Sequence, residues 1–240
     1  VLMDIDQEDD ALLLLTSIEE HADEYPQALL SLADYYQMQG FYETAEQKIN
    51  QALALMPSEP VLIFAKAELL LETGKYLEAV RLYENLKEQT DEIAGIRLSE
   101  RLAEVYSSGA AYEEAIPYYD ESLSHHVTPD LLFGLAYAAF QAGEYDLAVR
   151  KLNEVKTLDP DYFSAHLLLS QAYSMLEDHE QAYSAIVDGL SRDEYDKELY
   201  LFAGKMALKV GNTNDAEAHL RQAIVLDPEY MEATLTLVSF

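Results

Sequence analysis

Apolar residues along this chain recur at helical spacing, in pairs of short segments separated by glycine or proline. Residues 26–59 show the pattern clearly. Their apolar positions three or four residues apart predict two amphipathic helices, and Gly40 and Pro57 mark where each helix ends. The first stripe contains Leu29, Leu32, Ala33 and Tyr36, and the second contains Ala45, Ile49, Ala52 and Leu53. The segment therefore predicts a hairpin of two helices that cross closely at the small residues Ala33 and Ala45.

The hairpin pattern returns at a nearly constant interval. The phrases GFYETA (40–45), GKYLEA (74–79), GEYDLA (143–148) and GNTNDA (211–216) occupy corresponding places. The closing alanines are spaced by 34, 36, 33, 34 and 34 residues, at Ala45, Ala79, Ala115, Ala148, Ala182 and Ala216. A fixed period of this length predicts stacked copies of one helical unit, which form an extended surface and not a single globular core.

The residues at these places resemble the tetratricopeptide repeat. Residues 129–162 carry the resemblance through Leu132, Ala136, Gly143, Ala148 and Pro160, and residues 197–230 repeat the same register. The resemblance implies an all-α fold, a right-handed α-α superhelix of helix-turn-helix repeats. It also implies that the first helix of each pair lines a concave side that binds an extended or helical peptide.

We expect one solenoid domain over residues 1–240, as a fragment of a longer chain. Its full repeats are 26–59, 60–94, 95–128, 129–162, 163–196 and 197–230, with half repeats at 8–25 and 231–240. In the third repeat, Gly109 comes one residue early, and Pro117 lies either in the first turn of the second helix or inside it. In the fifth repeat, Glu177 replaces the turn glycine and Gly189 replaces an alanine, so we expect this hairpin to be the loosest.

The composition and charge of the chain limit the classes of molecule that it is expected to bind. The 240 residues are 50% hydrophobic, which argues against disorder despite a formal net charge of −30. Such acidity disfavours binding to nucleic acid or to an anionic membrane and favours a basic protein partner, although it also serves solubility. There is no cysteine and no apolar run of bilayer length. These features favour a bacterial cytoplasmic protein, although exported bacterial proteins also often lack cysteine.

The sequence contains no pattern that predicts catalysis, a metal site or a cofactor. His125 and His126 are adjacent, so on a helix they point about 100° apart and do not readily share a metal. The acidic stretch at 4–10 lacks the glycine and final glutamate of a calcium loop. Phosphate-binding and hydrolase motifs are missing too. We therefore expect a protein that is not an enzyme.

The first helices contain more apolar residues than one packing stripe needs, and a surplus of this kind predicts a recognition surface. The alternative is that neighbouring helices bury these side chains. The surplus, our predicted peptide-binding groove, comprises Leu30, Phe64, Phe133, Tyr137, Phe140, Leu167, Leu168, Leu201, Phe202 and Leu208. Arg97 and Arg101 supply positive charge near the middle, but Glu100 and Glu104 flank them. No asparagine accompanies these arginines on the first helices of the full repeats, so we reject the Lys/Arg/Asn clamp by which some family members hold a terminal carboxylate.

These observations favour a scaffold or adaptor that binds a peptide or helix of a partner protein in its concave groove. Two alternatives stay open. One is a regulatory repeat arm of a larger enzyme. The other is a structural module that self-associates through an open C-terminal helix in 231–240.

Overall fold

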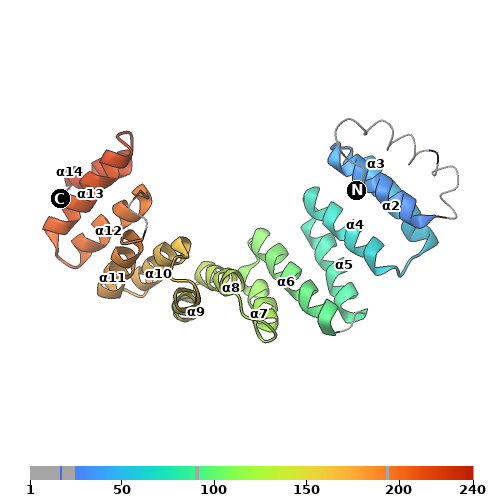
Figure 1. Ribbon diagram of the computed structural model, residues 1–240, viewed down its shortest axis with the longest axis horizontal. Coiled ribbons are helices and arrows are strands. Elements are labelled where there is room, and N and C mark those ends of the chain that lie inside the picture. The colour runs from blue at the N-terminus through green and yellow to red at the C-terminus, as the bar shows by residue number, and fades with distance from the viewer. Residues whose placement is uncertain (1–16, 18–24, 90–91, 193–194, 240) are drawn as a thin grey trace. The chain divides into compact units, whose positions relative to one another are not determined.

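The protein is all-helical throughout the residues that the computed structural model describes, namely 17, 25–89, 92–192 and 195–239. The chain divides into two compact units, residues 1–109 and 110–240. The helices of each unit follow one another in chain order (Figure 1). The first unit contains α2 (Pro26–Met38), α3 (Tyr42–Leu55), α4 (Pro60–Glu72), α5 (Tyr76–Gln89) and α6 (Glu92–Ser108).

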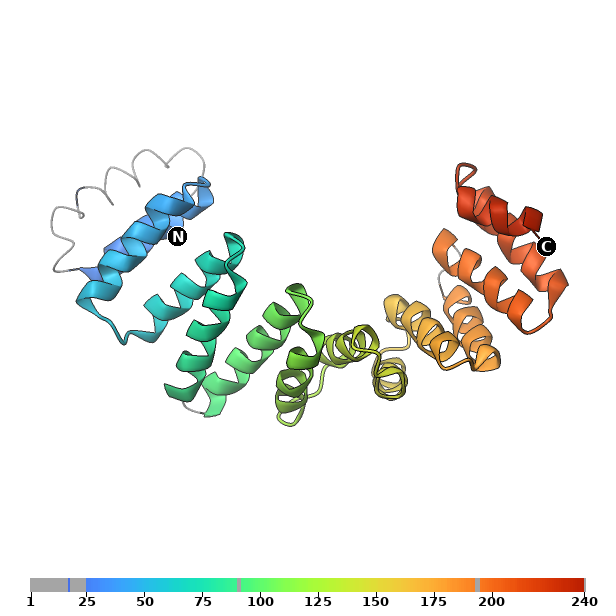
Figure 2. The same ribbon diagram turned by 180° about the vertical axis from the view of Figure 1, so that it is seen from behind.

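The second unit continues the same arrangement, as the reverse view in Figure 2 also shows. Its helices are α7 (Tyr112–Leu123), α8 (Pro129–Gln141), α9 (Tyr145–Leu158), α10 (Phe163–Met175), α11 (His179–Leu190), α12 (Lys197–Lys209), α13 (Thr213–Leu226) and α14 (Met231–Ser239). The predicted all-α fold of helix-turn-helix repeats is therefore confirmed. The expected half repeat at 8–25 lies almost entirely outside the described residues, and the single solenoid over 1–240 stays a prediction.

Small residues set how closely the two helices of a pair approach. Ala33 and Ala45 are fully buried, as are their counterparts Ala136 and Ala148. Leu135 and Leu152 fill the space beside the second crossing and are also fully buried. Burying each leucine contributes roughly 1.5–3 kcal/mol. The alanine repeat that was visible in the sequence is thus the packing contact of each hairpin.

The turn inside each hairpin requires a residue with positive φ. Gly40, Gly74, Gly143 and Gly211 have φ between 74° and 83°. After Gly40, the Phe41 N–H donates to the Tyr36 carbonyl at 2.8 Å, a bond that closes a left-handed helix cap. Two turns lack glycine at this place, where Ala110 and Glu177 adopt φ of 58° and 62°. Gly109 therefore does not supply the third turn, because Ala110 occupies the position that needs positive φ.

Pro117 and Gly189 depart from the repeat pattern, and the structure shows where each of them lies. Pro117 is the sixth residue of α7, so of the two expected alternatives it takes the interior position and not the first turn. Gly189 lies against His166, and a Cβ at Gly189 would come within 2.8 Å of the His166 Cβ. His166 is fully buried and its Nε2 lies 3.1 Å from the Pro160 carbonyl oxygen. Gly189 thus permits a close contact between α10 and α11 where we had expected a loosened pair.

Candidate functional site

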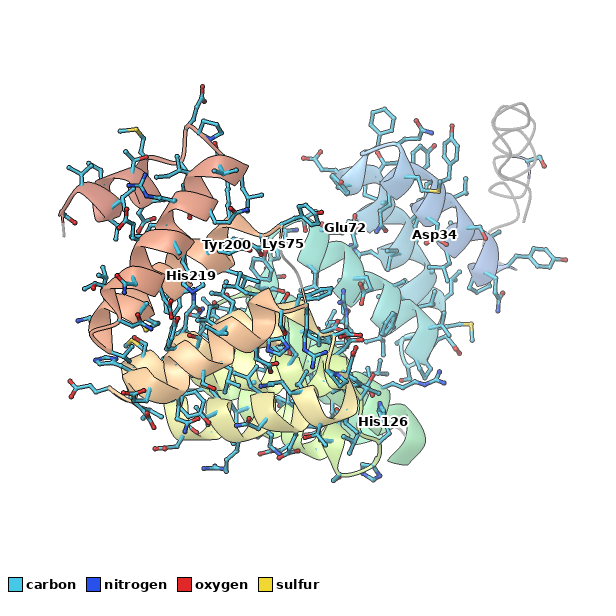
Figure 3. The ribbon with its side chains drawn as sticks, turned by 60° about the vertical axis from the view of Figure 1, so that its left-hand side comes forward. Asp34, Glu72, Lys75, His126, Tyr200 and His219 are labelled. Carbon is cyan, nitrogen blue, oxygen red and sulfur yellow. The ribbon has the colours of Figure 1, made fainter. Side chains whose placement is uncertain are left out.

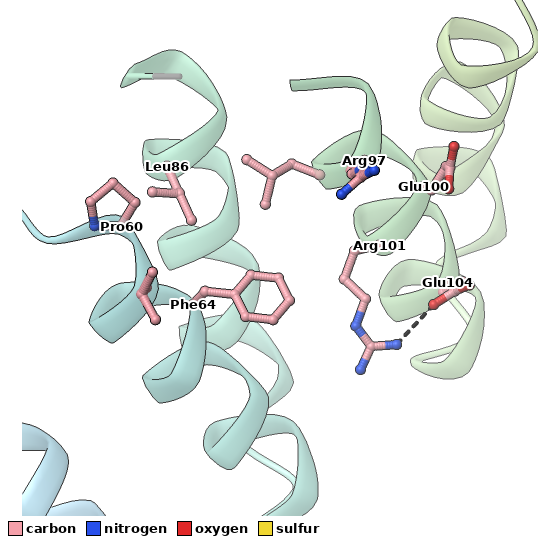
Figure 4. A pocket seen from close by; sticks show the side chains of 9 residues that line it. Pro60, Phe64, Leu86, Arg97, Glu100, Arg101 and Glu104 are labelled. Carbon is pink, nitrogen blue, oxygen red and sulfur yellow. Dashed lines mark hydrogen bonds and ion pairs between the residues drawn. The ribbon is translucent and has the colours of Figure 1, made fainter. Parts of the chain in front are cut away.

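An open hollow of about 640 Å³ lies between α4, α5 and α6 in the first unit. Figure 4 shows Pro60 and Phe64 of α4 on one side and Arg97 and Arg101 of α6 on the other. Leu86 of α5 adds to the apolar side. The remaining lining residues are Val61, Leu98, Glu100 and Glu104. The hollow therefore combines an apolar side with a charged wall, which is typical of a site that binds a side chain of another molecule.

The apolar side is held in place while it stays accessible. Pro60 occupies the first turn of α4, where its missing N–H costs no helical hydrogen bond. Phe64 follows one turn later, and its ring packs edge-on against the buried Tyr83 ring with centroids 5.6 Å apart. Even so, Phe64 is 39% exposed and Val61 is 59% exposed. Because the Phe64 ring is already packed against Tyr83, it can bind an apolar side chain with little loss of its own conformational entropy.

Arg101 is engaged by carboxylates of two helices. Its Nε donates to Glu68 Oε1 at 2.8 Å, its Nη2 to Glu68 Oε2 at 2.6 Å, and its Nη1 to Glu104 Oε2 at 2.8 Å. The Tyr83 hydroxyl also donates to Glu68. Burial is the main cause that raises the pKa of Tyr83, and its hydrogen bond to Glu68 adds to this effect. The hydrogen bonds to Glu68 raise the pKa of Arg101. The bidentate pair joins α4 to α6, so it positions the wall and leaves Arg101 with little charge to offer.

Arg97 differs from Arg101. It lies one turn earlier on α6, is exposed, and lines the same hollow. Within the described ranges its guanidinium has no hydrogen bond and no ion pair. Arg97 is therefore the cation of this wall that is available to an incoming group.

A second hollow of about 480 Å³ lies near the C-terminal ends of α2 and α4. Asp34, Gln37 and Met38 of α2, Tyr42 of α3 and Glu72 of α4 line it. Figure 3 labels its two acids, Asp34 on α2 and Glu72 on α4. Among the residues that the structure describes, neither carboxylate has an ion pair.

The surroundings of this second hollow leave its acids uncompensated. The nearby Lys75 pairs with Glu46 at 3.0 Å instead. The Asp34 side chain is exposed, although desolvation by neighbouring atoms raises the pKa of its carboxyl. The hollow is thus an acidic site that would favour a cation.

The predicted groove residues divide into buried, half-buried and exposed groups. Leu168 and Leu201 belong to the core and are only 6% and 5% exposed. Phe64 and Tyr137 are each 39% exposed. The half-buried residues are Leu30, Phe133, Phe140, Leu167, Phe202 and Leu208.

Most of the half-buried residues are packed against neighbours. The ring centroids of Phe133 and Tyr162 are 5.0 Å apart, and those of Phe140 and Tyr145 are 5.5 Å apart. Leu30, Leu167 and Phe202 also pack against buried clusters. Of the predicted groove residues, Phe64 is the one that lines the large apolar hollow of the first unit. A binding role for the others stays a prediction.

Part of this site was not predicted from the sequence. Val61 and Leu98 line the hollow but were not among the predicted groove residues. Arg97 and Glu100 had been considered only as parts of a clamp that we rejected. The usable signal was that Val61 lies three residues before Phe64, on the same side of the helix.

Other surfaces offer less chemistry. In the described residues, no group of three or more His, Cys, Asp or Glu side chains is arranged to hold a metal ion. None of the helices in the described ranges has the length and apolar character needed to span a bilayer. Met231, Leu235 and Val238 form an exposed stripe on α14, with exposures of 65%, 63% and 81%. Self-association through this helix stays a prediction.

Comparison with protein families and curated proteins gives consistent matches. A family model described as YpiA-like tetratricopeptide repeats matches residues 37–91, and a tetratricopeptide repeat model matches residues 101–163. The TPR repeat-containing protein YpiA of Bacillus subtilis is 40% identical over 239 residues, covering all of this chain. The protein MJ1428 of Methanocaldococcus jannaschii is 29% identical over 125 residues, half of this chain. The chain spans 56% of YpiA, and the match to half of this chain covers 21% of MJ1428.

Solved structures show the same fold. The C-terminal part of a TPR repeat-containing protein from Cytophaga hutchinsonii has a TM-score of 0.81 with 16% identity, and covers 96% of this chain and 95% of its own. YrrB, described as a TPR protein with an unusual peptide-binding site, has a TM-score of 0.64 with 18% identity. That match covers 78% of this chain and 96% of YrrB.

Proposed function

Because the chain belongs to the tetratricopeptide repeat family, whose repeats typically mediate protein–protein interactions, we propose that it is an interaction scaffold. Its ligand is a segment of a partner protein, and the binding site is the hollow between α4, α5 and α6. The observation that carries this proposal is the exposed pair of Val61 and Phe64, with Phe64 packed against Tyr83, opposite the unpaired Arg97. We assign the protein no catalytic role.

Two further observations support a peptide as the ligand. The hollow is open on one side, as a segment of an extended chain requires, and it is large enough for one or two apolar side chains. The structurally similar YrrB is itself described as having a peptide-binding site. Affinity would come mainly from an apolar residue of the partner that packs on Phe64, because a few central apolar contacts usually dominate such interfaces.

The test changes Val61, which lies in the hollow, and compares it with a matched position outside it. Val61 and Leu77 are the second residues of α4 and α5, and both are exposed, at 59% and 76%. An acid in the first turn of a helix is favourable, so Val61→Glu and Leu77→Glu should both fold. Peptides of about 12 residues are first selected from a random displayed library on the unchanged protein, and their dissociation constants are then measured by fluorescence anisotropy.

We expect Val61→Glu to weaken binding at least about tenfold, a loss of about 1.4 kcal/mol, because a carboxylate would have to be buried against the apolar residue of the peptide. Leu77→Glu should leave binding within about twofold, which is a free-energy change below 0.5 kcal/mol. Circular dichroism confirms that both variants fold. The proposal fails if the selected peptides bind both variants as tightly as they bind the unchanged protein.

A further inference from the structure

Helices α2, α4 and α6 carry apolar and acidic side chains at different places, and this distribution indicates what kind of peptide they bind. We infer that the bound segment carries an apolar residue at the α4–α6 hollow and a lysine or arginine about 12 Å away, at the hollow lined by Asp34 and Glu72. This inference rests on the proposed function and adds the sequence class of the partner.

The first step concerns the apolar end. Val61 and Phe64 provide the contact for an apolar side chain, while Arg97 stands on the opposite wall with no ion pair among the described residues. A lysine or arginine placed there would face the Arg97 guanidinium. Two carboxylates line the same hollow, but Glu104 already pairs with Arg101, and Glu100 already has an interaction of its own. This end therefore favours the apolar residue of the segment over the basic one.

The second step concerns the middle of α4. Phe64, Glu68 and Glu72 are each four residues apart, so they lie along one side of the helix. Glu68 accepts hydrogen bonds from Arg101 and Tyr83, so its charge is already compensated. The middle of the face thus offers little attraction to either sign of charge.

The third step concerns the acidic end. Asp34 and Glu72 line one hollow, have no ion pair in the described part of the chain, and lie near the C-terminal ends of α2 and α4. The helix macrodipole places partial negative charge at those ends, which adds to the two carboxylates. The Gln37 amide and the Tyr42 ring border the same hollow and can contact the long stem of a basic side chain. The net charge of −30 for the whole chain further favours a basic group here.

The spacing follows from helix geometry. Phe64 and Glu72 are eight residues apart on α4, and at 1.5 Å per residue this corresponds to about 12 Å. An extended peptide advances about 3.3 Å per residue and covers that distance in about four residues. The predicted motif is therefore an apolar residue and a basic residue separated by about four positions in an extended segment.

The experiment uses displayed random peptides of about 12 residues as the probe, selected in parallel on the unchanged 240-residue chain and on the double variant Asp34→Lys with Glu72→Lys. A control double variant, Glu88→Lys with Glu229→Lys, makes the same change in net charge at exposed positions that line neither hollow. We expect the unchanged chain and the control to enrich an apolar residue with lysine or arginine at the stated spacing. The Asp34/Glu72 variant should lose that basic preference.

Binding constants of one selected peptide complete the test. The Asp34/Glu72 variant should bind it at least about tenfold more weakly than the control variant does, and changing its basic residue to glutamate should reverse this order. Peptides that depend on Val61 yet show no basic preference, with equal affinity for both double variants, would overturn this inference and leave the proposed function intact. Peptides indifferent to Val61→Glu would remove the proposed function itself.

Discussion

At the scale of single residues, Ala110 and Glu177 stand where four other hairpins have glycine. Their φ values of 58° and 62° place a Cβ in the left-handed region, where a non-glycine residue costs roughly 1–2 kcal/mol. Backbone hydrogen bonds hold the fifth turn in this conformation, since the Asp178 N–H donates to the Tyr173 carbonyl at 3.0 Å. The turn thus keeps the shape of its glycine counterparts at the expense of local strain.

Glu177→Gly should therefore stabilise the protein. Removing the strain outweighs the added freedom of glycine in the unfolded chain, and we expect a net gain of about 0.5–1 kcal/mol. Glu177 is exposed, so little packing is lost. Urea unfolding followed by circular dichroism measures the change. The reverse substitution, Gly143→Ala, should destabilise the chain, because Gly143 has φ of 83°; an unchanged midpoint for both variants would contradict this account of the turns.

The repeating positions could be predicted from the sequence, but contacts between residues of different helices could not. The alanine spacing located each helical crossing, because only small side chains fit where two helices approach closely. The role of Gly189 was not visible, since it depends on where the buried His166 of another helix lies. Likewise, nothing in the sequence separates the engaged Arg101 from the unpaired Arg97, because Glu68 lies 33 residues away along the chain.

At the scale of elements, α7 contains a proline in its interior. Pro117 has no N–H, so it cannot donate to the Glu113 carbonyl four residues earlier, and its ring crowds that carbonyl. The helix persists because Ala115 and Tyr119 are buried against the neighbouring helices of the second unit. Tertiary packing here outweighs an unfavourable local preference.

Pro117→Ala should stabilise the second unit by about 1–3 kcal/mol, since it restores the missing helical hydrogen bond. Pro117 is exposed, so alanine removes little buried surface. Thermal unfolding and amide hydrogen exchange across 112–123 measure the effect. Pro129→Ala is the matched control, because Pro129 occupies the first turn of α8 and should contribute far less. Equal effects of the two substitutions would argue against interior strain in α7.

At the scale of the whole molecule, the repeat pattern predicted the hairpins and their order better than it predicted the binding surface. Most of the aromatic residues expected to bind a partner pack against other rings or buried clusters in the second unit. The large apolar hollow lies in the first unit instead, where Val61 and Phe64 stay exposed. Counting surplus apolar residues does not reveal which of them a neighbouring ring covers.

The most direct measurement of the central claim is amide hydrogen exchange of the full 240-residue chain, with and without a saturating selected peptide. The account predicts slower exchange in α4 and α6, within 60–72 and 97–108, with α8 and α10 unchanged. Slower exchange confined to α8, α10 or α12, with α4 and α6 unaffected, would contradict it and return the binding site to the aromatic residues of the second unit.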